Sequence, residues 1–121
     1  MGLGNFLYKR WLGCGYAWKG AVALVRREPS VQVQLFIGIA ITVFGFIMDI
    51  SRTDWMLQTF AIGLVMACEG LNSAIEGICD FVHPDRHPAI GHIKDIAAGA
   101  VVFAAITAVI IAGLIYVPLF I

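Results

Sequence analysis

The amino-acid sequence predicts an all-α integral membrane protein, with three transmembrane helices and an amphipathic helix before them. The chain of 121 residues is 60% hydrophobic and only 13% charged, and its mean hydropathy is +0.89. Soluble domains are about half apolar and a quarter charged. One domain over residues 1–121 accommodates the whole pattern. A formal net charge of zero excludes a basic nucleic-acid-binding protein.

Residues 6–27 predict a helix that lies in the headgroup plane of the membrane. Apolar side chains recur every three or four residues, and lysines and arginines lie off that stripe. The stripe consists of Leu7, Trp11, Cys14, Trp18, Val22 and Val25. Pro29 then either ends this segment or begins the next helix.

Three apolar segments follow, each with about the 20 residues that cross a bilayer. They are residues 31–48, 55–81 and 95–117, joined by links at 49–54 and 83–94. Five basic residues precede the first segment, Arg86 and Lys94 lie in the second link, and only Arg52 lies in the first. The positive-inside rule therefore predicts a cytoplasmic N-terminus and second link, with the C-terminus outside.

The second segment carries a polar stripe on an otherwise apolar helix. Its members are Glu69, Asn72, Glu76 and Asp80, at spacings of 3, 4 and 4. At about 100° per residue they fall within an arc of roughly 80°. An ionisable group in the bilayer costs roughly 2.5–3.5 kcal/mol, so such groups usually serve transport, proton relay or a metal site.

Phosphoryl transfer is one chemistry that this stripe could support. It needs oxygen ligands for Mg²⁺, a cation for phosphate oxygens and a base near the accepting hydroxyl. Glu76 and Asp80 are one turn apart, and Glu69 lies deeper, at the level of a lipid hydroxyl. Lys94 and Asp95 open the third segment at the same membrane level. Glu28, just before the first segment, lies near enough to the interface to join them.

Two other classes of function stay open from the residues alone. There is no P-loop or Rossmann glycine motif, and a polar helix face also fits a transporter or a proton-carrying subunit. Clustering of the acids near Lys94 favours a ligand site. A purely structural membrane protein would leave the cost of the buried acids unexplained.

Alanines at a spacing of four in the third segment permit close helix contact, although alanine is common in membrane helices anyway. They are Ala100, Ala104, Ala108 and Ala112. Because three helices barely enclose the acidic stripe, we expect a homo-oligomer that buries it between protomers.

The histidines and cysteines favour structural roles. His83 and His87 are four apart, but Pro84 and Pro88 break the helix that would place them on one face. Solvated loop histidines are therefore favoured over a zinc site. The three cysteines have no metal-ligand spacing, and we interpret them as small packing residues.

Three sequence motifs resemble one known family. Glu69-Gly-Leu-Asn-Ser-Ala-Ile-Glu-Gly-Ile-Cys-Asp80, Lys94-Asp-Ile-Ala-Ala-Gly-Ala-Val101 and Gly15-Tyr-Ala-Trp-Lys-Gly20, together with Glu28, are similar to the prokaryotic diacylglycerol kinases, which include undecaprenol kinases. The resemblance implies a homotrimeric inner-membrane enzyme that transfers the γ-phosphate of MgATP to a lipid alcohol. It also implies active sites between protomers at the cytoplasmic interface.

The resemblance further implies a role for each matching residue. Glu69 would be the general base, and Glu28 and Glu76 would hold Mg²⁺. The ATP-binding residues would be Lys9, Tyr16, Glu28, Glu76, Asp85, Arg86, His87, Lys94 and Asp95. Further active-site positions would be Asn72, Asp80, Trp18 and Ala98.

The motifs leave the lipid substrate open between two branches. Undecaprenol kinases usually carry Glu-x-Asn-x-x-x-His at the start of the first span, where this chain has Ser30 and Gln34 in the two key places. The histidine-proline link and the third-segment motif resemble the undecaprenol branch, whereas Gly15–Gly20 resembles the diacylglycerol branch.

Overall fold

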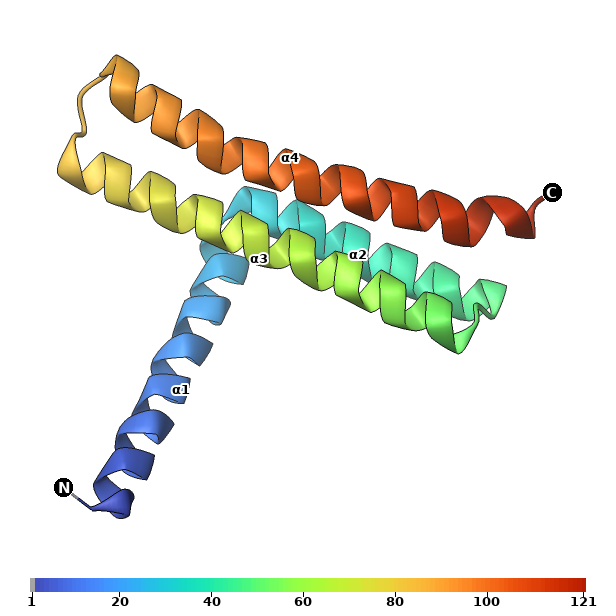
Figure 1. The fold of residues 1–121 in the computed structure, drawn as a ribbon, viewed down its shortest axis with the longest axis horizontal. Coiled ribbons are helices and arrows are strands. Elements are labelled where there is room, and N and C mark those ends of the chain that lie inside the picture. The colour runs from blue at the N-terminus through green and yellow to red at the C-terminus, as the bar shows by residue number, and fades with distance from the viewer. Residues whose placement is uncertain (1) are drawn as a thin grey trace.

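The computed structural model describes residues 2–121, and nearly all of them are helical (Figure 1). The elements are α1 (Leu3–Arg27), α2 (Pro29–Met48), α3 (Arg52–Val82), α4 (Pro88–Tyr116) and a final 3-10 turn, η1 (Val117–Leu119). Three helical stretches, Pro29–Met48, Arg52–Val82 and Pro88–Leu119, are long and apolar enough to cross a membrane. The predicted all-α class is confirmed, and the three apolar segments lie in the three helices that could span a membrane.

Helices α2, α3 and α4 lie side by side, while α1 leaves the start of α2 at a steep angle (Figure 1). Two hydrogen bonds set the register of α3 against α4: Lys94 of α4 bonds Asp80 of α3, and Tyr116 of α4 bonds Gln58 of α3. The residue numbers of each pair sum to 174, so residue i of α3 lies level with residue 174 − i of α4. Gly38 faces Ile62 and Gly45 faces Trp55, which places residue i of α3 level with residue 100 − i of α2.

This register leaves part of α3 and α4 without α2 beside it. Pro29, the first residue of α2, lies level with Leu71 of α3. Beyond that level only the two longer helices continue, to their connecting loop (Figure 1). We call residues 72–82 and 88–102 the α3–α4 extension. At 1.5 Å per residue its α3 part is roughly 16 Å long.

The corner between α1 and α2 is held by backbone and side-chain hydrogen bonds. Glu28 ends α1 and precedes Pro29, whose fixed φ suits the first position of a helix. The Glu28 N–H donates to the Leu24 carbonyl (3.1 Å). The Gln32 amide donates to two α1 carbonyls, at 3.0 and 3.1 Å. Leu24 also packs on Gly70, so the corner rests on α3 beside Glu69.

A buried polar cluster joins α2, α3 and α4 near the opposite end. The Tyr116 hydroxyl donates to Gln58 Oε1, and Gln58 Nε2 donates to the Ile41 carbonyl (3.3 Å). Ile50 and Ile115 are buried around it. A buried amide in a spanning segment needs such partners, because no water is present to replace them.

The start of α4 differs from the sequence-based expectation. The helix begins at Pro88 rather than at 95, so the link ends at residue 87 and His92 and Lys94 are helical. The His87 ring nitrogen accepts from the Ala89 N–H (3.1 Å) and caps the helix, and Pro88 occupies its first position. The hydropathy pattern missed this turn because its residues are polar. Helix α1 likewise begins at Leu3, before the predicted residue 6.

Candidate functional site

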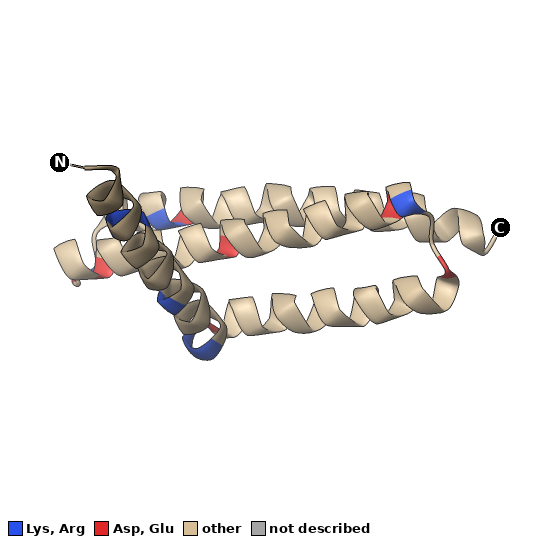
Figure 2. Ribbon diagram, turned by 90° about the horizontal axis from the view of Figure 1, so that it is seen from below, with Lys and Arg blue, Asp and Glu red and all other residues tan. Residues whose placement is uncertain are grey.

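Charged residues gather toward the two ends of the three-helix bundle, and the stretch between them carries none (Figure 2). The candidate site lies where α2 begins. Glu69 is only 7% exposed and lies level with Val31 of α2, which is 1% exposed. Ala105 of α4 lies on the same level. Glu69 is thus a buried carboxylate at the end of the three-helix part where α2 begins.

Asn72 lies one turn further along α3, and its side-chain oxygen is buried without a hydrogen-bond partner among residues 2–121. Buried polar atoms nearly always have a partner, so an orphaned acceptor beside a carboxylate calls for an explanation. A hydroxyl or water donor at this position would satisfy both side chains. The pair therefore fits a ligand that carries a hydroxyl group.

The α3–α4 extension carries the remaining polar residues of the stripe. Lys94 Nζ lies 2.6 Å from Asp80 Oδ1, and the two side chains stay partly exposed. Glu76 is exposed between Asn72 and Asp80 on α3, level with the small residue Ala98. Asp95 is exposed beside Lys94. The structure therefore brings a lysine to the acidic stripe, as the sequence predicted.

The loop between α3 and α4 presents Asp85, Arg86 and His87, all exposed. The prolines do separate His83 and His87 from a common helix face. The turn nevertheless places their rings edge to face, with centroids 5.2 Å apart. His83 Nδ1 also contacts the Asp85 carbonyl (2.8 Å). This loop is ordered by its own contacts at the far end of the α3–α4 extension.

Three predicted site residues lie on α1 and are exposed. Lys9 and Tyr16 were predicted to bind the nucleotide, and Trp18 was predicted as a further active-site position. The Lys19 ammonium lies over the Tyr16 ring, 5.8 Å from its centroid. Because α1 projects away from the bundle, one chain does not enclose Glu69 with these side chains (Figure 1). Glu28, at the corner, is half-buried.

The carboxylates fit a nucleotide-bound magnesium ion better than a metal site made by protein alone. Within residues 2–121 no group of three or more His, Cys, Asp or Glu side chains is placed to bind a metal. Mg²⁺ in nucleotide sites is usually held by one or two carboxylates, with phosphates and water as the other ligands. Glu28 and Glu76 are oxygen donors of that kind.

Fold and site together define a helical membrane protein with a polar, partly exposed site at one end of its bundle. Residues 15–116 match the prokaryotic diacylglycerol kinase family. The undecaprenol kinase of Bacillus subtilis is 34% identical over 103 residues, which is 85% of this chain and 84% of that protein. The diacylglycerol kinase of Escherichia coli K12 is 33% identical over 96 residues, 79% of each chain.

A diacylglycerol kinase of Synechocystis is 31% identical over 104 residues, which is 85% of this chain but 59% of that longer protein. The chain therefore belongs to the prokaryotic diacylglycerol kinase family. It is a lipid kinase embedded in the membrane by three helices.

Sequence reasoning missed two glutamines that the structure makes important. Gln32 bonds the end of α1 and so holds the corner that carries Glu28. Gln58 is buried on the same α3 face as Glu69. The spacing of Gln58 in the sequence could have revealed this, because it lies eleven residues, or about three helical turns, before Glu69 in an apolar run.

Proposed function

We propose that the protein transfers the γ-phosphate of ATP, with Mg²⁺, to the hydroxyl of a membrane lipid alcohol. One observation carries the proposal. The buried Glu69 and the unpaired Asn72 oxygen lie where the three-helix bundle gives way to the exposed α3–α4 extension. A lipid hydroxyl from one side and a water-soluble nucleotide from the other can meet at that level.

The proposed placement in the membrane follows from α1. None of its residues is buried within the chain, and its stripe exposes Leu7, Trp11 and Trp18. A helix with such a stripe and flanking lysines suits the headgroup plane. With the N-terminus and the α3–α4 loop in the cytoplasm, Glu69 lies at the inner interface of the bacterial cytoplasmic membrane. The α3–α4 extension then reaches from the level of Glu69 into the cytoplasm.

In the proposed reaction Glu69 accepts the proton of the lipid hydroxyl, whose oxygen attacks the γ-phosphorus. The bond between that phosphorus and the β–γ bridging oxygen breaks, and ADP leaves. Asn72 accepts a hydrogen bond from the bound ligand and orients it. Lys94, held by Asp80, offers its ammonium to phosphate oxygens. Positioning and charge stabilisation are what such transfers require.

Glu28 and Glu76 are the proposed carboxylate ligands of the nucleotide's Mg²⁺, which supplies charge neutralisation at the phosphates. The corner hydrogen bonds from Gln32 hold Glu28 in place near the start of α2. Glu76, exposed on the α3–α4 extension, is accessible from water. Asp95 and the loop residues Asp85, Arg86 and His87 are proposed to contact the nucleotide from the same side.

We further propose a homotrimer in which α1 of one protomer covers the site of a neighbour. The exposed positions of Lys9, Tyr16 and Trp18 support this arrangement, because the helix that carries them projects away from the bundle that holds Glu69 (Figure 1). The acceptor is proposed to be diacylglycerol or undecaprenol, the lipids named by the relatives in E. coli and B. subtilis.

The test is transfer of ³²P from γ-labelled ATP to lipid in mixed micelles, with diacylglycerol, undecaprenol and no lipid in parallel. Wild-type protein should label one of the two lipids. Glu69→Gln should reduce transfer by at least about a hundredfold, because general base catalysis contributes roughly 10²–10⁴. Asp49→Asn, a carboxylate change at the opposite end of the bundle, is the matched control. Retained activity in Glu69→Gln would remove Glu69 as the base.

The same experiment separates the lipid kinase from other membrane functions. Label in neither lipid, with folded protein and Mg²⁺ present, would count against both proposed acceptors. Protein-dependent ion flux in liposomes without ATP turnover would then indicate transport.

A further inference from the structure

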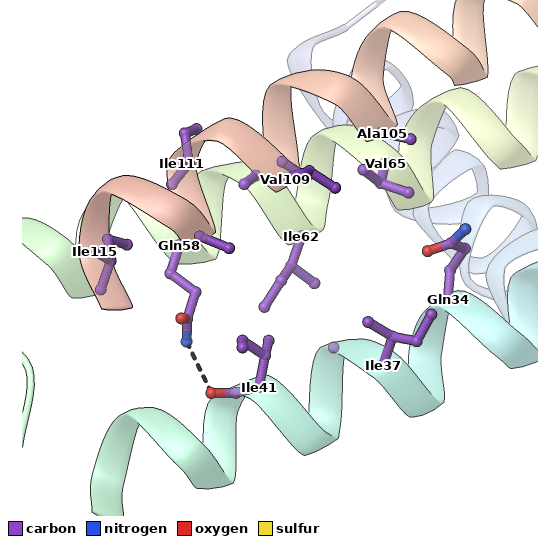
Figure 3. A pocket seen from close by; sticks show the side chains of 14 residues that line it. Gln34, Ile37, Ile41, Gln58, Ile62, Val65, Ala105, Val109, Ile111 and Ile115 are labelled. Atoms are coloured by element: carbon purple, nitrogen blue, oxygen red, sulfur yellow. Dashed lines mark hydrogen bonds between the residues drawn. The ribbon is translucent and has the colours of Figure 1, made fainter. Parts of the chain in front are cut away.

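A cavity of roughly 310 Å³ lies between α2 and the α3–α4 pair. Its walls are aliphatic side chains, alanines and one glycine from all three helices (Figure 3). Only two polar side chains line it, Gln34 near one end and Gln58 near the other. A cavity with this lining disfavours ions and polar solutes, because burying a polar group without partners is costly.

The cavity begins directly below the proposed catalytic carboxylate. Val65 lines it one turn before Glu69 on the same buried face of α3. Ala105, which lies level with Glu69 on α4, lines it too. Along α3 the lining residues run from Val65 to Gln58, seven residues apart or roughly 10 Å. This is about a third of a bilayer's hydrocarbon thickness of roughly 30 Å.

The far end of the cavity is closed by a polar cross-link. Gln58 and Ile115 form its last wall, and the Tyr116 hydroxyl bonds the Gln58 amide oxygen behind them. The Gln58 amide nitrogen donates to the Ile41 carbonyl on the opposite side (Figure 3). Gln58 is 4% exposed and Tyr116 is 7% exposed. Three helices are therefore joined at the depth where the cavity stops.

We propose that this cavity holds a hydrocarbon tail of the lipid alcohol whose hydroxyl reaches Glu69, and that the Gln58–Tyr116 pair limits the length of tail it accepts. The inference rests on the proposed function, because it assigns the tail of that same substrate. An apolar chain matches the aliphatic lining. Because the cavity extends to the level of Glu69, one lipid molecule can place its tail in the cavity and its hydroxyl beside Glu69. Gln34, at the mouth of the cavity, borders the start of the tail.

The test fills the cavity at its middle. Ala112 lines it from α4 at the level of Ile62, and Ala112→Phe and the smaller Ala112→Leu shorten the available space. Gly113→Phe, a position on the same helix outside the lining and with nothing within 4 Å of an added Cβ, is the matched control. Each variant is assayed with diacylglycerols from dihexanoyl to dioleoyl. Changes of a few methylenes in an apolar pocket alter kcat/KM by about tenfold or more, so the filled variants should lose at least that much on dioleoyl lipid relative to dihexanoyl lipid.

Each outcome decides between the two proposals. If wild-type protein labels neither undecaprenol nor a diacylglycerol of any length, the proposed function fails. If lipid is labelled but Ala112→Phe and Ala112→Leu affect all tail lengths equally, or none, the cavity assignment is overturned. If these variants instead dissociate the oligomer while Gly113→Phe does not, a helix of a second copy occupies the cavity, which also overturns the assignment.

A second measurement does not depend on the filled variants folding. A diacylglycerol with a diazirine at the tail end is photolysed with wild-type protein, and the labelled residues are mapped by mass spectrometry. Label on Ile41, Gln58 or Ile115 supports the proposal, whereas label confined to the outward faces of the helices contradicts it. Gln58→Ala removes the closing amide, and it should shift the preference of the enzyme toward longer tails.

Discussion

At the scale of single residues, the site divides into two environments on one face of α3. Glu69 and the Asn72 oxygen are withdrawn from solvent, while Glu76 and Asp80 stand on the exposed α3–α4 extension. The same residue type is thus proposed to serve two purposes. A buried carboxylate suits proton transfer to or from a lipid hydroxyl, and an exposed one suits ions and phosphates that arrive from water.

The Asp80–Lys94 ion pair should matter for activity and little for stability. Both side chains are partly exposed, and exposed ion pairs contribute about 0–1 kcal/mol. Lys94→Met should therefore change the free energy of unfolding by less than about 1 kcal/mol, while lowering phosphate transfer strongly. Detergent unfolding followed by circular dichroism, together with the lipid assay, measures both. Asp80→Asn keeps the lysine and serves as the comparison; large destabilisation in either variant would contradict this role.

At the scale of helices, the turn between α2 and α3 sets their register. Asp49 adopts a left-handed conformation (φ 51°), and the Ile50 N–H returns to the Gly45 carbonyl (3.3 Å). Ser51 then caps α3 by accepting from the Asp54 N–H (3.1 Å). Trp55, one residue later, lies over Gly45. This packing of a ring on a glycine brings the two helices close together.

Gly45→Val should destabilise the bundle. A Cβ at Gly45 would lie 2.8 Å from Cη2 of Trp55 and 3.2 Å from Cδ1 of Ile50. The Trp55 ring already pairs with Phe46 at 4.7 Å, so it has little freedom to move. Overpacking of this kind costs about 1–3 kcal/mol. Unfolding in detergent measures the loss, and Gly63→Val, where nothing lies within 4 Å, is the control. Equal stability of the two variants would show that the contact relaxes freely.

At the scale of the whole molecule, two links hold the three spanning helices in the arrangement that forms the site. The Gln32 bonds and the Leu24–Gly70 contact hold the α1–α2 corner against α3 beside Glu69. The Gln58–Tyr116 cluster closes the opposite end of the bundle. Between these links lies the apolar cavity. The bundle is therefore joined at both ends and left open in the middle.

Tyr116→Phe should lower stability by about 1 kcal/mol, because hydrogen bonds between membrane helices contribute an average of about 0.6 and at most about 1.7 kcal/mol. The variant leaves the buried Gln58 amide oxygen without its partner. The double variant Gln58→Leu with Tyr116→Phe removes both groups, and such paired replacements are often nearly neutral. Detergent unfolding of the two single variants and the double variant forms the test. Additive losses would mean that the two side chains are not coupled.

The sequence by itself determined the helical class, the three spanning segments and the composition of the polar stripe. Each is a local property: hydropathy counts residues in one segment, and the positions of Glu69, Asn72, Glu76 and Asp80 follow from the period of one helix. The sequence also placed Lys94 near the stripe, because the link before it returns the chain to the same side of the membrane as Asp80. The early start of α4 escaped the pattern, because a capping turn of polar residues resembles a loop.

Only the tertiary structure decided how deep each group lies. The register of α2 against α3 rests on Gly38 and Gly45, and that of α3 against α4 on Asp80–Lys94 and Gln58–Tyr116. These partners are far apart in the chain, so no local period reveals them. They place Glu69 beside the first turn of α2, leave Glu76 exposed, and create the cavity beneath the site. Depth is set by packing between helices, and that packing separates a buried carboxylate from a solvated one.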